Sequence, residues 1–266
     1  MRVDWKGQLV QIRELGQGPA VVLVHGYPLD GAMWSGVART LSGRFRVLKP
    51  DLPGRGENPA PPDGTIDGYA DFLQAILAEV PPPAGLAGFS MGGYVSLALM
   101  KRGTAGVRAL ALVDTRAGAD DEAGRAARET AIATVRSGGA AAIADGMIPR
   151  LLAPASAQNA SLVERLRRII VRQKPETIES DLTAMRDRPD STAFLPRIGV
   201  PSIVLAGDQD VITPPAEGQA MAAAIPGARF AAIPASGHLT PMERPGSVAA
   251  ALGDFFAAAL LPNAAP

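Results

Sequence analysis

Apolar positions follow two different patterns along the first part of the chain. Residues 21–24 form a continuous run of β-branched and aliphatic side chains, which is typical of a strand buried on both faces. Residues 71–80 instead place apolar side chains at helical spacing, and the prolines at 81–83 end that helix. The same patterns predict an initial hairpin turning at Lys6-Gly7, strands at 45–48, 85–89, 109–114, 202–206 and 229–233, and helices at 34–41 and 91–101.

Strands and helices joined by short connections predict the α/β class, with a mostly parallel, doubly wound sheet. The alternation stops over residues 117–195, where four helical patterns follow one another at 122–137, 140–152, 161–173 and 175–188. We therefore expect one α/β core formed by 1–116 and 196–266, interrupted by a helical cap at 117–195. A surface lid and ordinary packing helices would both give this pattern.

Composition excludes several kinds of function. The 26 basic and 26 acidic residues cancel and aromatic residues reach only 5%, so neither nucleic acid nor an anionic membrane is favoured as a partner. The absence of cysteine excludes disulfides, thiolate metal sites and a cysteine nucleophile, and two histidines exclude a three-histidine metal site. The first residues lack the apolar core of a secretion signal, and the apolar stretch at 248–261 is shorter than the roughly 20 residues of a membrane span. We expect a soluble, cytoplasmic protein, monomeric or homo-oligomeric.

A serine stands at a predicted strand-to-helix turn. Residues 88–92 read Gly-Phe-Ser-Met-Gly, which fits the G-x-S-x-G motif, and Gly93 extends it. Small residues on either side of Ser90 allow the strand and the helix to approach closely at such a turn. Ser90 is therefore the candidate nucleophile, although a glycine-rich turn can also arise by chance.

A serine hydroxyl needs a base, and the chain offers two histidines for that role. His238 follows the last predicted strand at the carboxyl edge of the sheet, which favours it over His25. An acid must then orient the imidazole. Asp210, in the loop after the strand at 202–206, is the preferred acid, with Asp208 and Asp114 as alternatives.

The order Ser90, Asp210, His238 on alternating strands resembles that of the α/β-hydrolase fold family, and the resemblance covers nearly the whole chain. The segment His-Gly-Tyr-Pro at 25–28 is similar to the family loop that supplies an oxyanion-hole N–H from the residue after His-Gly. Residues 51–58 are similar to the family's D-x-x-G-x-G-x-S segment, with an asparagine in place of the final serine.

Within the family, this loop and the Gly-Phe-Ser-Met-Gly-Gly motif resemble the esterase, enol-lactonase and cofactor-free haloperoxidase group. That resemblance implies a serine hydrolase acting on a small to medium carboxylic ester through an acyl-enzyme, without metal or organic cofactor. The backbone N–H groups of Tyr27 and Met91 would form the oxyanion hole, and His25 would hold its loop by hydrogen bonds. Lactone hydrolysis, carbon–carbon bond hydrolysis and acyl transfer to peroxide could use the same residues, and a non-catalytic binding protein could retain the fold.

Three further side chains are candidates for contact with the substrate. Trp34, Met147 and Met185 lie on predicted helices and could line a pocket, although apolar helix residues more often belong to the core. Residues 243–245, Glu-Arg-Pro, predict the start of the final helix, with the glutamate in an N-terminal capping segment. Four arginines between 165 and 172 indicate a solvated helix face.

Overall fold

The computed structural model describes residues 1–59, 64–103 and 106–261. Its main sheet has seven strands in the order β3-β5-β4-β6-β7-β8-β9, parallel except for β3, so the predicted mostly parallel sheet is confirmed. The strands are β1 (Arg2–Trp5), β2 (Gln8–Gln11), β3 (Arg13–Leu15), β4 (Ala20–Val24), β5 (Arg46–Lys49), β6 (Ala84–Phe89), β7 (Val107–Val113), β8 (Ser202–Gly207) and β9 (Arg229–Ile233).

The N-terminal hairpin is confirmed, but it accounts for only part of the segment before residue 16. β1 and β2 pair with each other in a separate small sheet, whereas β3 pairs antiparallel with β5 at the edge of the main sheet. All three residues of β3 are exposed, so this strand has no alternating apolar pattern. The sequence therefore contained no sign that it is a strand separate from the hairpin.

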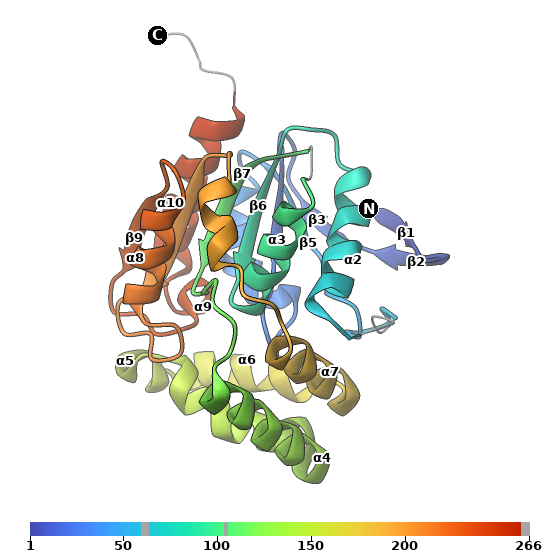
Figure 1. Ribbon diagram of the computed structural model, residues 1–266, viewed down its shortest axis with the longest axis vertical. Coiled ribbons are helices and arrows are strands. Elements are labelled where there is room, and N and C mark those ends of the chain that lie inside the picture. Colours follow the sequence, from blue (N-terminus) through green and yellow to red (C-terminus); the bar gives the residue numbers. More distant parts are fainter. Residues whose placement is uncertain (60–63, 104–105, 262–266) are drawn as a thin grey trace.

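Helices cover both faces of the sheet, as expected of a doubly wound fold (Figure 1). The connection through α1 runs from β4 to β5, toward the β3 edge of the sheet, whereas the connections through α2, α3 and α8 run toward the β9 edge. Because such crossovers are right-handed, α1 lies on one face of the sheet and α2, α3 and α8 lie on the other. α10 packs against α1. The helices are α1 (Ser35–Leu41), α2 (Ile66–Ala78), α3 (Met91–Lys101), α4 (Glu122–Leu151), α5 (Pro154–Ala157), α6 (Ala160–Val171), α7 (Pro175–Arg186), α8 (Pro215–Ala224), α9 (Thr240–Glu243) and α10 (Pro245–Leu260).

The starts of α1 and α2 differ from those predicted. A 3₁₀ turn at Gly31–Trp34 precedes α1, which begins at Ser35 rather than at the tryptophan. α2 begins at Ile66, several residues before the predicted start, because the Thr65 hydroxyl caps it by accepting the N–H of Gly68 at 2.9 Å. The glycine in its first turn hides this extension from the apolar pattern.

The segment between β7 and β8 is helical, and α4, α6 and α7 lie together below the sheet in Figure 1. The two helices predicted at 122–137 and 140–152 form the halves of α4, which is interrupted at Gly139 with φ of +64°. A positive φ is accessible to glycine at little cost, so the break occurs there. Within the described residues, none of the helices has the length and apolar character required to span a bilayer.

A buried ion pair connects this helical segment to the core. Arg55 donates to both carboxylate oxygens of Asp181 on α7, and both side chains are almost fully buried. The Tyr69 hydroxyl donates to the same carboxylate at 2.6 Å, and Arg55 Nε donates to the carbonyl of Leu29 at 2.8 Å. The pair therefore joins α7, α2 and the loop after β4.

Replacing Asp181 with alanine is expected to lower the free energy of unfolding by about 3–5 kcal/mol, because the Arg55 guanidinium stays buried without its partner. Urea unfolding followed by circular dichroism measures the loss. Glu179→Ala removes the partly exposed partner of the exposed Arg136 and is the matched control, with almost no expected change in the unfolding midpoint. Equal losses of unfolding free energy in the two variants would contradict the claim that the buried ion pair stabilises the fold more than the surface pair does.

Candidate active site

Ser90 lies between β6 and α3 in a strained backbone conformation. Its φ and ψ are +50° and −116°, values that a residue with a side chain rarely adopts. A Cβ added at Gly92 would lie 2.5 Å from the carbonyl oxygen of Val24 and 2.6 Å from that of His25, so only glycine fits there. The turn therefore has the close strand-to-helix approach that the sequence motif predicts, and it lies against the loop after β4.

The structure brings Ser90, His238 and Asp210 together at one edge of the sheet. They follow the parallel strands β6, β9 and β8, so the carboxyl ends of these strands meet there. Ser90 Oγ lies 3.0 Å from His238 Nε2, and His238 Nδ1 lies 2.8 Å from Asp210 Oδ2. All three side chains are buried. The predicted nucleophile, base and acid thus form one hydrogen-bonded chain.

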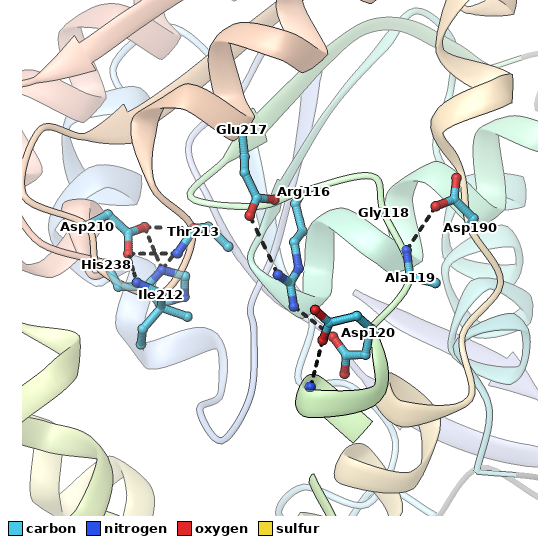
Figure 2. Close-up of polar contacts among 12 residues, drawn as sticks. Arg116, Gly118, Ala119, Asp120, Asp190, Asp210, Ile212, Thr213, Glu217 and His238 are labelled. Carbon is cyan, nitrogen blue, oxygen red and sulfur yellow. Dashed lines mark hydrogen bonds and ion pairs between the residues drawn. The ribbon is translucent and has the colours of Figure 1, made fainter. Parts of the chain in front are cut away.

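Hydrogen bonds hold the Asp210 carboxylate toward the histidine (Figure 2). Its Oδ1 accepts the N–H groups of Ile212 at 2.7 Å and Thr213 at 3.0 Å, and its Oδ2 accepts the Thr213 hydroxyl at 2.7 Å. Burial alone would raise the pKa of Asp210, but the charge of His238 and these hydrogen bonds outweigh it and lower that pKa. An ionised Asp210 accepts the Nδ1 proton of His238, which leaves Nε2 free to accept from Ser90.

The two alternative acids occupy other positions. Asp208 is exposed and accepts the N–H of Ser236 at 3.2 Å, which stabilises the turn. Asp114 is fully buried; it accepts the Gly207 N–H at 2.9 Å and the Thr240 hydroxyl at 2.5 Å. Burial and the neighbouring negative charge of Asp210 raise the pKa of Asp114. The structure therefore places Asp210 against the imidazole and Asp114 behind the loops that carry the site.

His25 holds the loop after β4. Its Nδ1 donates to the carbonyl of Gly26 at 3.0 Å, and its Nε2 accepts the N–H of Leu52 at 2.9 Å. Burial lowers the pKa of His25 to about 3, so the imidazole is neutral. The two N–H groups predicted for an oxyanion hole belong to Tyr27 in this loop and to Met91, the first residue of α3.

The three predicted substrate-contact residues lie in different environments. Trp34 is fully buried, and its ring packs edge-on against Phe89, the residue before Ser90, with ring centres 6.3 Å apart. Met185 is buried in α7, whereas Met147 on α4 is only partly buried. Trp34 and Met185 thus belong to the apolar core, and contact with substrate stays a prediction for all three.

The predicted start of the final helix at residues 243–245 is confirmed, since Arg244 is the N-cap residue of α10 and Pro245 is its first residue. The Glu243 carboxylate points to the His238 loop and accepts the N–H groups of Gly237 and Leu239. Sequence reasoning also missed Thr213, whose hydroxyl lies 3.2 Å from His238 Nδ1. The one signal in the sequence was proximity along the chain, since Glu243 lies five residues after His238 and Thr213 lies three residues after Asp210.

Comparisons with known proteins agree with this geometry. A sequence model described as "Alpha/beta hydrolase family" matches residues 21–251. The chain is 31% identical to a pimeloyl-[acyl-carrier protein] methyl ester esterase from Chromobacterium violaceum, over 85% of this chain and 90% of that protein. A thermophilic esterase from Thermogutta terrifontis shares 36% identity with a TM-score of 0.91, covering 98% of both chains. The enol-lactonase from Burkholderia xenovorans LB400 shares 26% identity with a TM-score of 0.87, covering 96% of this chain and 99% of that one. The resemblance to esterases and enol-lactonases is confirmed, and the chain belongs to the alpha/beta hydrolase family.

Proposed function

We propose that this carboxylic ester hydrolase cleaves small to medium, mostly apolar esters through an acyl-enzyme formed on Ser90. The observation that carries the proposal is the hydrogen-bonded chain from Ser90 Oγ through His238 to Asp210, with distances of 3.0 Å and 2.8 Å. A nucleophile, a base within hydrogen-bond reach and a group that orients the base are the parts required for this chemistry.

In the first half of the proposed reaction, Ser90 Oγ attacks the ester carbonyl carbon while its proton moves to His238 Nε2. Asp210 accepts a hydrogen bond from the Nδ1–H group of His238 and stabilises the imidazolium. When the tetrahedral intermediate collapses, the bond to the alcohol oxygen breaks and the imidazolium returns the proton to the leaving alcohol. In the second half, water attacks the acyl-enzyme, His238 takes its proton, and the acid is released as Ser90 regains its hydrogen.

The negative charge of each tetrahedral intermediate needs donors. Met91 opens α3, so its N–H has no partner within the helix and lies at the positive end of the helix dipole. The Tyr27 N–H in the loop held by His25 is the second proposed donor. Losing one such donor typically costs about 10²–10³-fold in kcat, so the two amides account for a substantial part of the proposed rate enhancement.

Residues 117–195 are proposed as a cap that sets the size of the substrate. Esterases among the relatives support an ester substrate, and the similarity to an enol-lactonase makes lactone hydrolysis the second candidate. Both reactions use the same attack on a carbonyl carbon and differ only in whether the leaving alcohol stays attached to the acyl group.

A series of p-nitrophenyl esters tests the proposal. We expect kcat/KM to peak at an acyl chain between acetate and octanoate. For longer chains, as far as palmitate, it should fall about tenfold or more for each methylene that the pocket cannot hold. A fluorophosphonate should label Ser90 with the mass of one phosphonyl group, and a lactone measured in parallel separates the two candidate functions. Absence of both turnover and labelling would identify a non-catalytic binding protein.

A further inference from the structure

The carboxylate of Glu243 is buried beside His238, at the end of α9. Its Oε1 accepts the N–H of Gly237 at 2.9 Å and that of Leu239 at 3.2 Å, the two residues that flank the histidine. The Ser236 hydroxyl adds a longer contact to the same oxygen at 3.4 Å. One carboxylate oxygen therefore fixes the backbone on both sides of His238.

The other oxygen of Glu243 reaches the end of the long helix α4. Its Oε2 accepts the N–H of Ala153 at 2.9 Å, across ninety positions of sequence. The N–H of Leu239 also lies 3.2 Å from the carbonyl oxygen of Leu151. A Cβ added at Gly237 would lie 2.6 Å from the Ala153 nitrogen, so the loop and residues 151–153 are in direct contact. Glu243 thus bridges the histidine loop and the proposed cap.

The far side of the histidine loop is held by the sheet. Asp114 accepts both the hydroxyl and the N–H of Thr240, at 2.5 Å and 3.3 Å. With Asp114 on one side and Glu243 on the other, the loop is clamped between β7 and residues 151–153. A base must be placed closely against its nucleophile, because a displacement of about 1 Å can cost about 10²-fold in rate.

We propose that Glu243 is a positioning residue that fixes the His238 imidazole by binding its loop to the cap segment 151–153. The inference rests on the proposed role of His238 as the base, and it adds that the cap segment must be docked for that base to be aligned. Glu243 acts through the backbone of the loop and takes no part in the chemical steps.

Glu243→Ala is expected to lower kcat for p-nitrophenyl acetate about 10²-fold, with KM unchanged within about threefold, because the base moves and the binding site does not. Glu243→Gln keeps one acceptor oxygen but turns an amide donor toward Ala153, so we expect a loss of about tenfold. The downfield Nδ1 proton resonance of His238 should broaden or shift in both variants. Glu217→Gln, which alters a half-exposed partner of Arg116, should leave kcat and the resonance unchanged (Figure 2).

A second variant removes the same hydrogen bond from the other side. Ala153 has φ of −59° and Leu152 is extended, so proline fits the backbone dihedral angles at 153. Ala153→Pro deletes the N–H that Glu243 accepts, and its ring Cδ displaces the Glu243 oxygen that lies 2.9 Å from the nitrogen. We expect a loss of about tenfold in kcat. The double variant with Glu243→Gln should lose no more than the worse single variant, because both changes break one contact. Losses that multiply would show that the two residues act independently and overturn the proposal.

Fluorophosphonate titration separates the possible failures. The final extent of Ser90 labelling counts folded enzyme, so kcat per labelled site reports on alignment even if a variant is partly unfolded, and Glu243→Gln carries the test should Glu243→Ala not fold. Full labelling with wild-type kcat in the Glu243 variants would refute the proposed role of Glu243 and leave the proposed function standing. A wild-type enzyme that is not labelled would refute the proposed function instead.

Discussion

Replacing Ser90 with alanine is expected to lower kcat for p-nitrophenyl acetate by about 10⁶-fold, the size of loss found when a serine protease loses its nucleophile. The variant keeps the proposed oxyanion donors and the base, but no acyl-enzyme can form. The fold should be retained, because alanine occupies less space at a position where the hydroxyl's partner is His238. Steady-state turnover and circular dichroism measure the two effects separately.

Ser96→Ala is the matched control for this substitution. Ser96 is a second buried serine, inside α3, and its hydroxyl donates to the carbonyl of Gly92 at 2.7 Å within the helix. We expect its loss to change kcat by less than about threefold, since a hydrogen bond of this kind contributes about 1 kcal/mol to folding. Turnover that survives in Ser90→Ala but falls in Ser96→Ala would place the reaction elsewhere in the protein.

The central strands could be predicted because burial on both faces leaves a continuous apolar run. Every residue of β4, β6 and β8 is buried, and all three were predicted within one residue of their ends. β3 gave no such signal, because its residues are exposed and it is held by pairing with β5 rather than by apolar packing. Sequence patterns report burial more directly than backbone pairing.

The candidate site likewise has parts that could be predicted from the sequence and parts that could not. The turn around Ser90 could be predicted because its steric demands fall on immediate neighbours in sequence. The sequence favoured Asp210 but left Asp114 and Asp208 as alternatives, since each stands just after the end of a strand. Their roles depend on partners brought close by the fold, such as the hydroxyl of Thr240 for Asp114.

Buried acids on helices were the least predictable feature. Asp181 lies on α7 and pairs with Arg55 across 126 positions of sequence, and Glu243 contacts Ala153 across 90. On a helix, an acidic residue normally indicates a solvated face or a cap, so local reasoning assigns such residues to the surface. Only the three-dimensional contacts show that these two connect the helical segment to the core.

Replacing Asp210 with asparagine is expected to lower kcat by about 10⁴-fold, as in other enzymes with this arrangement of residues. An amide can place its NH₂ group against His238 Nδ1, which favours the tautomer with hydrogen on Nε2. That nitrogen can no longer accept the Ser90 proton. The amide oxygen, in the place of Oδ1, can still accept the N–H groups of Ile212 and Thr213, so the loop should keep its shape. Turnover measured from pH 5 to 9, with circular dichroism for the fold, records the loss.

Asp114→Asn is the control that decides which carboxyl group serves the histidine. Burial and the charge of Asp210 raise the pKa of Asp114, which favours its neutral acid form, and an asparagine amide is a close mimic of that form. The amide oxygen can still accept the Gly207 N–H, and the NH₂ group can donate to the Thr240 hydroxyl. We therefore expect less than about a tenfold loss in kcat. A loss near 10⁴-fold at Asp114 with little effect at Asp210 would assign the orienting acid to the end of β7 instead.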